Sequence, residues 1–107
     1  MNQKSIYFQE AKRLLEPEPG CVMLDVREEE EFITGHPVEA ELLPLDSISP
    51  ESAADHIPTK ETPVLVYCRS GARSAQACSI LKRRGYDARN IGGVLGYRGR
   101  LERGTEE

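Results

Sequence analysis

The chain has 107 residues, of which 38% are hydrophobic and 30% are charged, and its formal net charge is −4. This length fits one small domain, and the absence of a long apolar run argues against a transmembrane helix and a membrane partner. The aromatic content of 6% offers no stacking platform for bases, which argues against a nucleic-acid partner.

Strand and helix patterns alternate along the chain. Taken in order, the predicted strands cover residues 5–7, 21–26, 42–45, 63–67 and 88–91. The predicted helices cover about residues 8–15, 28–34, 50–56, 74–84 and 94–101. Residues 102–107 are expected to form a flexible tail, so a single domain is predicted over residues 1–107 with its core at about 5–101.

Local signals support several of these boundaries. Ser49 and Pro50 resemble an N-cap and a first helical residue, and Gly85 is a helix stop. The continuous apolar run at residues 64–67 is typical of a strand that is covered on both faces. Because strands alternate with helices, we expect an α/β fold with a central five-stranded parallel sheet flanked by helices on both faces.

A hexapeptide that follows the strand at residues 63–67 carries the clearest chemical signal. It reads Cys68-Arg69-Ser70-Gly71-Ala72-Arg73. Where a strand turns into a helix, backbone N–H groups point at one spot and the helix dipole adds positive potential there. In open α/β sheets, ligands bind beyond the carboxyl ends of the strands, which is where Cys68 falls. The sequence therefore predicts an anion-binding loop around a cysteine whose thiol pKa lies below the usual value of about 8.5.

The cysteine pattern indicates a reducing environment. Cys21, Cys68 and Cys78 are odd in number and lack the Cys-x2-Cys spacing of zinc sites, so neither a disulfide framework nor a structural metal is expected. Cys21 and Cys78 each lie in an apolar pattern, which favours packing over a redox role. The first residues are not followed by the apolar stretch of a secretory signal, so a cytoplasmic location is expected, or a periplasmic one if a signal peptide has been removed.

Charge is distributed unevenly. Between Arg69 and Arg103, basic residues far outnumber acidic ones. This asymmetry favours a positive field around Cys68 that attracts small anions. The run Lys82-Arg83-Arg84 fits equally well a solvated helix end that complements the helix dipole, and the sequence leaves both interpretations open.

Three blocks of sequence resemble the rhodanese family of single-domain sulfurtransferases, which includes the phage-shock-type rhodaneses. They are Leu24-Asp25-Val26-Arg27-Glu28 with Glu31-Phe32 and Gly35-His36, the active-site loop from Val66 to Ser74, and the closing motif Asn90-Ile91-Gly92-Gly93-Val94. The chain departs from the family pattern at two places, where Pro37-Val38-Glu39 replaces Ile-Pro-Gly and Tyr97 replaces Trp.

This resemblance implies a thiosulfate sulfurtransferase that needs no metal or organic cofactor. Cys68 would attack the outer sulfur of thiosulfate or a similar anionic donor, release sulfite and keep the sulfur as a persulfide. Cyanide, a cellular thiol or a sulfur-accepting protein would then take this sulfur. The expected substrate-binding residues are Arg69, Ser70, Gly71, Ala72, Arg73 and Ser74. Their amides would hold the persulfide charge, and the two guanidinium groups would clamp the donor's oxygens.

Other interpretations accompany this one. A persulfide carrier or interaction module would use the same loop with little thiosulfate turnover. The cell-division-cycle phosphatases resemble rhodaneses in fold, but their loop has the spacing Cys-x5-Arg, whereas Cys68 and Arg73 are spaced as Cys-x4-Arg. Near the loop, Asp25 and Arg27 are expected to form an internal ion pair, and His36 is expected to make a structural hydrogen bond rather than act as a base.

Overall fold

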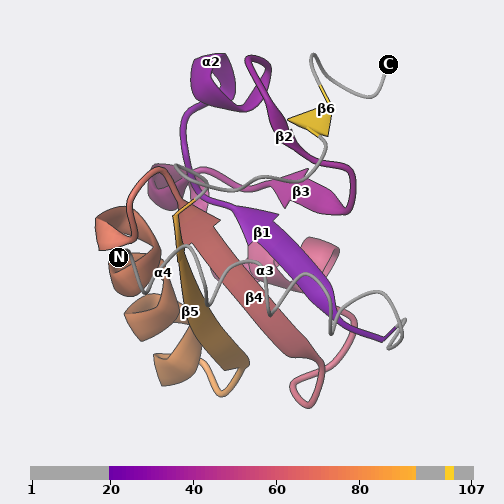
Figure 1. The fold of residues 1–107 in the computed structure, drawn as a ribbon. Helices are drawn as coiled ribbons and strands as arrows, with labels where there is room; N and C mark the ends of the chain where they lie inside the picture. The colour runs from indigo at the N-terminus through magenta and orange to yellow at the C-terminus, as the bar shows by residue number, and fades with distance from the viewer. Residues whose placement is uncertain (1–19, 94–100, 103–107) are drawn as a thin grey trace.

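The computed structural model describes residues 20–93 and 101–102, which contain a four-stranded parallel sheet (Figure 1). Its strands are β1 (Val22–Asp25), β3 (Ala40–Leu42), β4 (Pro63–Cys68) and β5 (Asp87–Gly93), in the order β3-β1-β4-β5. The predicted α/β fold with a parallel sheet is confirmed. The sheet has four strands instead of five, because the predicted strand at residues 5–7 lies outside the described residues, as does the predicted helix at 8–15.

Helical segments connect these strands. They are α2 (Glu29–Phe32), the 3-10 helix η1 (Leu45–Ser47), α3 (Pro50–His56) and α4 (Ala72–Arg83). α3 begins where the sequence predicts, because the Ser49 side chain accepts a hydrogen bond from Ser52 N at 3.0 Å and Pro50 is the first helical residue. α4 lies along β4 and β5 (Figure 1).

α4 begins earlier than the sequence predicts. Gly71 is its N-cap and has a φ of 110°, a left-handed conformation that residues with a Cβ rarely adopt. This conformation turns the chain into the helix at Ala72 rather than at Ser74. Ala72 and Arg73, which the sequence places in the loop, therefore lie in the first turn of α4.

Two other predictions are wrong in part. The third strand ends at Leu42 instead of residue 45, because Pro44 has no N–H to donate to a ladder and the chain turns into η1. The structure has a strand, β6 (Leu101–Glu102), where the predicted helix at 94–101 ends and the predicted tail at 102–107 begins. β6 pairs antiparallel with β2 (His36–Pro37), a distant partner that no local pattern reveals. The rest of that helix and tail lies outside the described residues.

Alternate side chains of the strands pack into two clusters, one on each face of the sheet. The first joins the strands to α3 and α4 and includes Leu24, Val66, Ala53 and Leu81. The second, on the opposite face, consists of Met23, Leu65, Tyr67 and Ile91. β4 is thus buried on both faces, as its apolar run predicts, and this packing fixes the position of Cys68 at its end.

No helix in the described part of the chain is both long enough and apolar enough to cross a membrane.

Candidate active site

Cys68 is the last residue of β4, and only 1% of its surface is exposed. The N–H of Gly71 donates a hydrogen bond to Cys68 Sγ at 2.9 Å, and Ser74 Oγ lies 3.6 Å from the same sulfur. The sulfur therefore faces the first turn of α4, where backbone N–H groups without helical partners and the helix dipole favour an anion.

The pKa of the Cys68 thiol is lowered below its ordinary value by a balance of opposing effects. Burial is the largest of them and raises the pKa, because it disfavours the charged thiolate. Hydrogen bonds from the Ser74 side chain and from the backbone of Ser74, Gly71 and Ser70 lower the pKa and together outweigh burial. The nucleophilic thiolate form is thus favoured by donors that are already in place.

Asn90 on β5 connects the loop to the neighbouring strand. Its Oδ1 accepts hydrogen bonds from Ser74 Oγ at 2.7 Å and from Gly92 N at 2.9 Å. Its Nδ2 donates to Gly71 O at 3.2 Å. The Gly92 contact lies at a β-bulge in the pairing of β4 with β5. Asn90 therefore holds Gly71 and Ser74, two of the residues that donate to Cys68, a role that sequence reasoning missed.

Gly93 at the end of β5 lies against the backbone of the loop. A Cβ placed on Gly93 would lie 2.1 Å from Arg69 O and 2.6 Å from Ser70 Cα, which is closer than such atoms can approach. Gly93 also pairs with Cys68 in the sheet. The second glycine of the Gly-Gly pair is therefore required by a close backbone approach.

Arg73 is one of the two arginines expected to bind the oxygens of the sulfur donor, and it contacts a carboxylate instead. Its Nη1 and Nη2 donate to Glu31 Oε1 and Oε2 at 2.7 and 2.9 Å, a bidentate pair between α4 and α2. These hydrogen bonds are the main reason that the pKa of Glu31 is lowered to about 2. Arg69, the other expected clamp, is exposed and makes no ion pair with a described residue. Ser70 and Ala72 are also exposed on the loop.

A buried ion pair lies near the loop, as the sequence predicts. Arg27 Nη2 lies 2.7 Å from Asp25 Oδ2, and Tyr67 OH donates to the same oxygen at 2.6 Å. His36 Nδ1 lies 2.8 Å from Phe32 O, and the two rings are stacked. The predicted structural roles of Asp25, Arg27 and His36 are therefore confirmed.

The other two cysteines are not part of this site. Cys78 lies in the first cluster, where burial raises the pKa of its thiol to about 11. Cys21 is half-buried beside the second cluster, so both cysteines have packing roles. All three cysteines are free of disulfides. Within residues 20–93 and 101–102, no group of His, Cys, Asp and Glu side chains could hold a metal ion.

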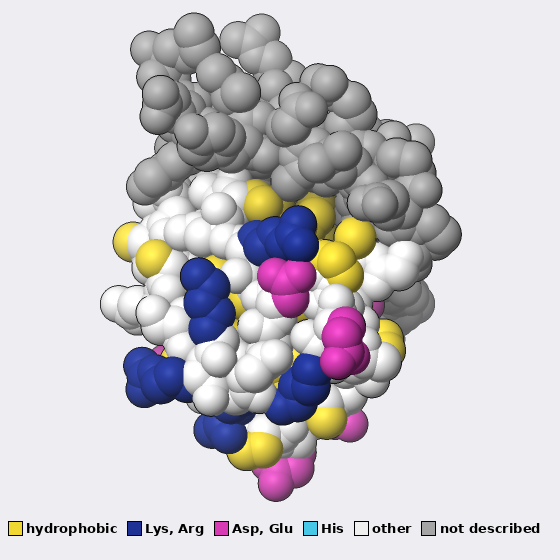
Figure 2. All heavy atoms as spheres, turned by 90° about the horizontal axis from the view of Figure 1, so that it is seen from below, with side chains coloured by type: hydrophobic (Ala, Val, Ile, Leu, Met, Phe, Trp, Pro, Cys, Tyr) yellow, Lys and Arg dark blue, Asp and Glu magenta, His cyan; other side chains and the backbone are white. Residues whose placement is uncertain are grey.

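The basic run after the loop does not surround Cys68. Lys82 and Arg83 lie at the opposite end of α4, and a helix of 12 residues is about 18 Å long. Arg89 pairs with Asp87 at 2.8 Å. Figure 2 views the molecule from this end and shows Lys and Arg side chains interspersed with Asp and Glu. These residues form a solvated helix end, so the positive field expected at Cys68 does not come from them.

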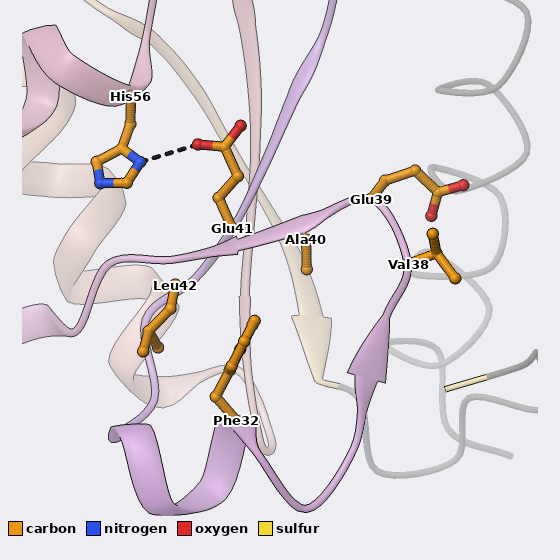
Figure 3. Close-up of a pocket in the computed structure, with 7 residues that line it drawn as sticks. All are labelled: Phe32, Val38, Glu39, Ala40, Glu41, Leu42 and His56. Carbon is orange, nitrogen blue, oxygen red and sulfur yellow. Dashed lines mark hydrogen bonds and ion pairs between the residues drawn. The ribbon is translucent and has the colours of Figure 1, made fainter. Parts of the chain in front are cut away.

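A separate pocket of about 480 Å³ lies beside β3 (Figure 3). It is lined by Phe32, Val38, Glu39, Ala40, Glu41, Leu42 and His56. His56 Nδ1 lies 2.9 Å from Glu41 Oε1 (Figure 3). No loop residue lines this pocket, and its two carboxylates disfavour an anionic ligand. This pocket is therefore separate from the loop at Cys68.

Sequence comparisons identify proteins that are similar to most of this chain. The family model described as the rhodanese-like domain matches residues 8–99. A sulfurtransferase of Allochromatium vinosum is 38% identical over 89 residues, which cover 83% of this chain and 75% of that protein. A tRNA uridine(34) hydroxylase of Protochlamydia amoebophila is 32% identical over 115 residues, which cover 99% of this chain. The chain spans only 35% of that hydroxylase.

Solved structures that are similar to this chain are also rhodaneses or rhodanese-like proteins. A rhodanese from E. coli, solved with anions, has a TM-score of 0.70 and 32% identity, over 78% of this chain and 98% of that one. A rhodanese-like domain protein from Staphylococcus aureus has a TM-score of 0.77 and 32% identity, over 92% of this chain and 95% of that one. The structural similarity therefore extends over most of this chain and most of each related chain.

Proposed function

The chain belongs to the family of rhodanese-like domains, and we propose that it is a sulfurtransferase in which Cys68 carries the transferred sulfur as a persulfide. The observation that carries this proposal is the buried Cys68 sulfur at the start of α4, with Gly71 N at 2.9 Å. A cysteine nucleophile needs a stabilised thiolate, and the lowered pKa of Cys68 is consistent with one. The similarity to a sulfurtransferase from A. vinosum supports the same reaction.

In the first half-reaction, the Cys68 thiolate attacks the outer sulfur of a sulfane donor such as thiosulfate. The bond between the two donor sulfurs breaks, and the leaving group, sulfite in that case, takes the electron pair. The N–H of Gly71 and the hydroxyl of Ser74 lie at Cys68 Sγ and are positioned to stabilise negative charge on the bound sulfur. Because these donors are fixed by α4 and Asn90, little reorganisation is required.

In the second half-reaction, a thiophilic acceptor attacks the outer sulfur of the persulfide. Cyanide serves in an assay, and a thiol or a protein thiol is the expected cellular acceptor. The new bond forms at the outer sulfur, the persulfide bond breaks, and the Cys68 thiolate is restored. Donor and acceptor thus react in turn at one residue, which is a ping-pong mechanism.

Thiocyanate formation from sulfane donors and cyanide tests this proposal. The wild-type protein should release thiocyanate, and Cys68→Ser should lose this turnover. Cys21→Ser is the matched control, because it removes a half-buried thiol outside the loop and should keep the activity. Equal turnover in Cys68→Ser and wild type would refute the role of Cys68.

Three alternatives differ in observable ways. A persulfide carrier would also load Cys68 but would pass the sulfur to one protein rather than to cyanide. A phosphatase is disfavoured because Arg73, the arginine of the Cys-x4-Arg spacing, donates both of its terminal nitrogens to Glu31 rather than to a bound anion. The alignment with the P. amoebophila hydroxylase covers nearly all of this chain, so a role in modifying tRNA uridine is a second candidate. Hydroxylation of a tRNA uridine by the purified chain would favour it.

A further inference from the structure

Two arginines close to the loop, Arg73 and Arg27, are each paired with a carboxylate. Arg73 places both terminal nitrogens on Glu31, at 2.7 and 2.9 Å. Arg27 is paired with Asp25 at 2.7 Å, and both are buried. Each pair carries one positive and one negative charge, so neither supplies net positive charge to an incoming anion.

Glu31 is held in place by a second contact. Its Oε1 accepts a hydrogen bond from Glu28 N at 3.0 Å, as part of the capping box that begins α2. The carboxylate therefore stays at one position, from which it bonds both ends of the Arg73 guanidinium. Arg73 cannot turn toward a donor at Cys68 without giving up two charge-assisted hydrogen bonds.

Arg69 is the remaining cation of the loop, and its side chain is exposed. Solvent and salt screen the attraction of an exposed charge. Thiosulfate brings two negative charges to a thiolate that already carries one, and like charges oppose this approach. The persulfide group of a small thiol such as cysteine brings at most one negative charge, so neutral N–H donors such as that of Gly71 are better matched to it.

We propose that the sulfur donor of this site is a thiol persulfide rather than thiosulfate, and that Glu31 sets this preference by engaging both terminal nitrogens of Arg73 and offsetting its charge. This inference rests on the proposed sulfur transfer by Cys68. Glu31 is accordingly a positioning residue that acts through Arg73.

The loading step balances without an additional reactant. The Cys68 thiolate attacks the outer sulfur of R–S–SH and forms a new S–S bond. The bond between the two donor sulfurs breaks, and R–S⁻ leaves with the electron pair. The proton stays on the transferred sulfur, so Cys68 ends as its persulfide and no oxidant or reductant is consumed.

Two alkylating reagents measure the electrostatic part of this proposal without sulfur transfer. Iodoacetate is anionic and iodoacetamide is neutral, and because both react with the thiolate, the ratio of their rates reports the local field. Glu31→Gln keeps an oxygen for the α2 capping bond but removes the charge. We expect it to raise the iodoacetate-to-iodoacetamide ratio by roughly three- to tenfold, because the positive charge of Arg73 is then no longer offset by the Glu31 carboxylate.

The matched control is Glu30→Gln, which makes the same change in net charge at an exposed position of α2. It should leave the alkylation ratio at the wild-type value. Adding Arg73→Gln to Glu31→Gln should return the ratio to that value, because the released cation is then absent. A ratio that rises equally in Glu30→Gln and Glu31→Gln overturns the role of Glu31.

Loading rates test the choice of donor. Wild-type protein should be loaded faster by cysteine persulfide, whose net charge is at most −1, than by thiosulfate. Glu31→Gln should accelerate loading by thiosulfate several-fold and change loading by the persulfide little. Faster loading of the wild type by thiosulfate would overturn the proposal. Failure of both donors to load Cys68 would overturn the sulfurtransferase function itself, and the alkylation ratio would still decide whether Glu31 controls the field.

Discussion

Ser74 Oγ has one proton and three acceptors within reach. Asn90 Oδ1 lies at 2.7 Å, Gly71 O at 3.0 Å and Cys68 Sγ at 3.6 Å. Hydrogen bonds to an ionised acceptor are stronger than those to a neutral one, so the proton is drawn toward the sulfur when the thiolate forms. The hydroxyl thereby replaces part of the hydration that the buried sulfur lacks.

Removal of this hydroxyl should raise the pKa of Cys68. Ser74→Ala deletes a donor that stabilises the thiolate, so the midpoint in the pH dependence of iodoacetamide alkylation should move upward. Ser79→Ala, at an exposed position of α4, is the control and should leave the midpoint unchanged. An unshifted midpoint in Ser74→Ala would mean that the backbone donors alone determine the thiol pKa.

Individual site residues differ in how well the sequence reveals them. The place of Cys68 follows from a local signal, because its strand, loop and helix are contiguous. The contact of Arg73 with Glu31 joins residues 42 positions apart, and that of Ser74 with Asn90 joins residues 16 apart. Their roles depend on tertiary packing, which the composition and spacing of the chain do not encode locally.

At the scale of elements, the site depends on how closely the end of β5 approaches the loop after β4. Gly93→Ala would place a methyl group on the loop backbone at Arg69 and Ser70, where no flexible side chain can move aside. We expect a loss of stability of about 1–3 kcal/mol or more and slower alkylation of Cys68, measured by chemical denaturation and by iodoacetamide kinetics.

Gly20 provides the control for this substitution. A Cβ at Gly20 meets no atom within 4 Å, so Gly20→Ala should be close to neutral in both measurements. Equal stability and reactivity of the two variants would contradict the close packing of β5 against the loop.

Elements with a local cause were predicted well, and those with a distant partner were not. α3 follows from the cap at Ser49 and Pro50, and β4 from its apolar run. The start of α4 was placed too late, because the left-handed Gly71 acts as its N-cap and draws Ala72 into the helix. The β2–β6 pair was missed since two-residue strands have no periodicity to detect.

At the scale of the whole molecule, the parallel sheet follows from the alternation of strands and helices, whereas the distribution of charge does not follow from the sequence. Residues close to Cys68 in sequence, such as Lys82 and Arg83, are carried away from it by the length of α4. The charged side chains beside the loop include Glu31 on α2 and Arg73 on α4, which offset each other. Only the three-dimensional packing separates the basic residues that lie far from Cys68 from the charged residues that lie beside the loop.

The ion pair between Glu31 on α2 and Arg73 on α4 should make the stability of the fold depend on pH in the acid range. The pKa of Glu31 is lowered from 4.5 to about 2 in the folded chain, so the unfolded chain binds more protons in that interval. The stabilisation from this carboxylate is present above about pH 4.5 and is lost as the pH falls toward 2. Glu31→Gln should therefore show a shallower loss of thermal stability between these values than Glu30→Gln. Identical acid profiles would mean that the pair with Arg73 contributes nothing to folding.

Intact-protein mass spectrometry can detect the sulfur that Cys68 is proposed to carry. Wild-type protein and Cys68→Ser are each treated with a sulfane donor, cysteine persulfide or thiosulfate, and then with cyanide. We expect a mass gain of one sulfur atom in the wild type only, reversed as thiocyanate is released. A gain of the same mass in Cys68→Ser, or no gain in the wild type from either donor, would contradict this expectation.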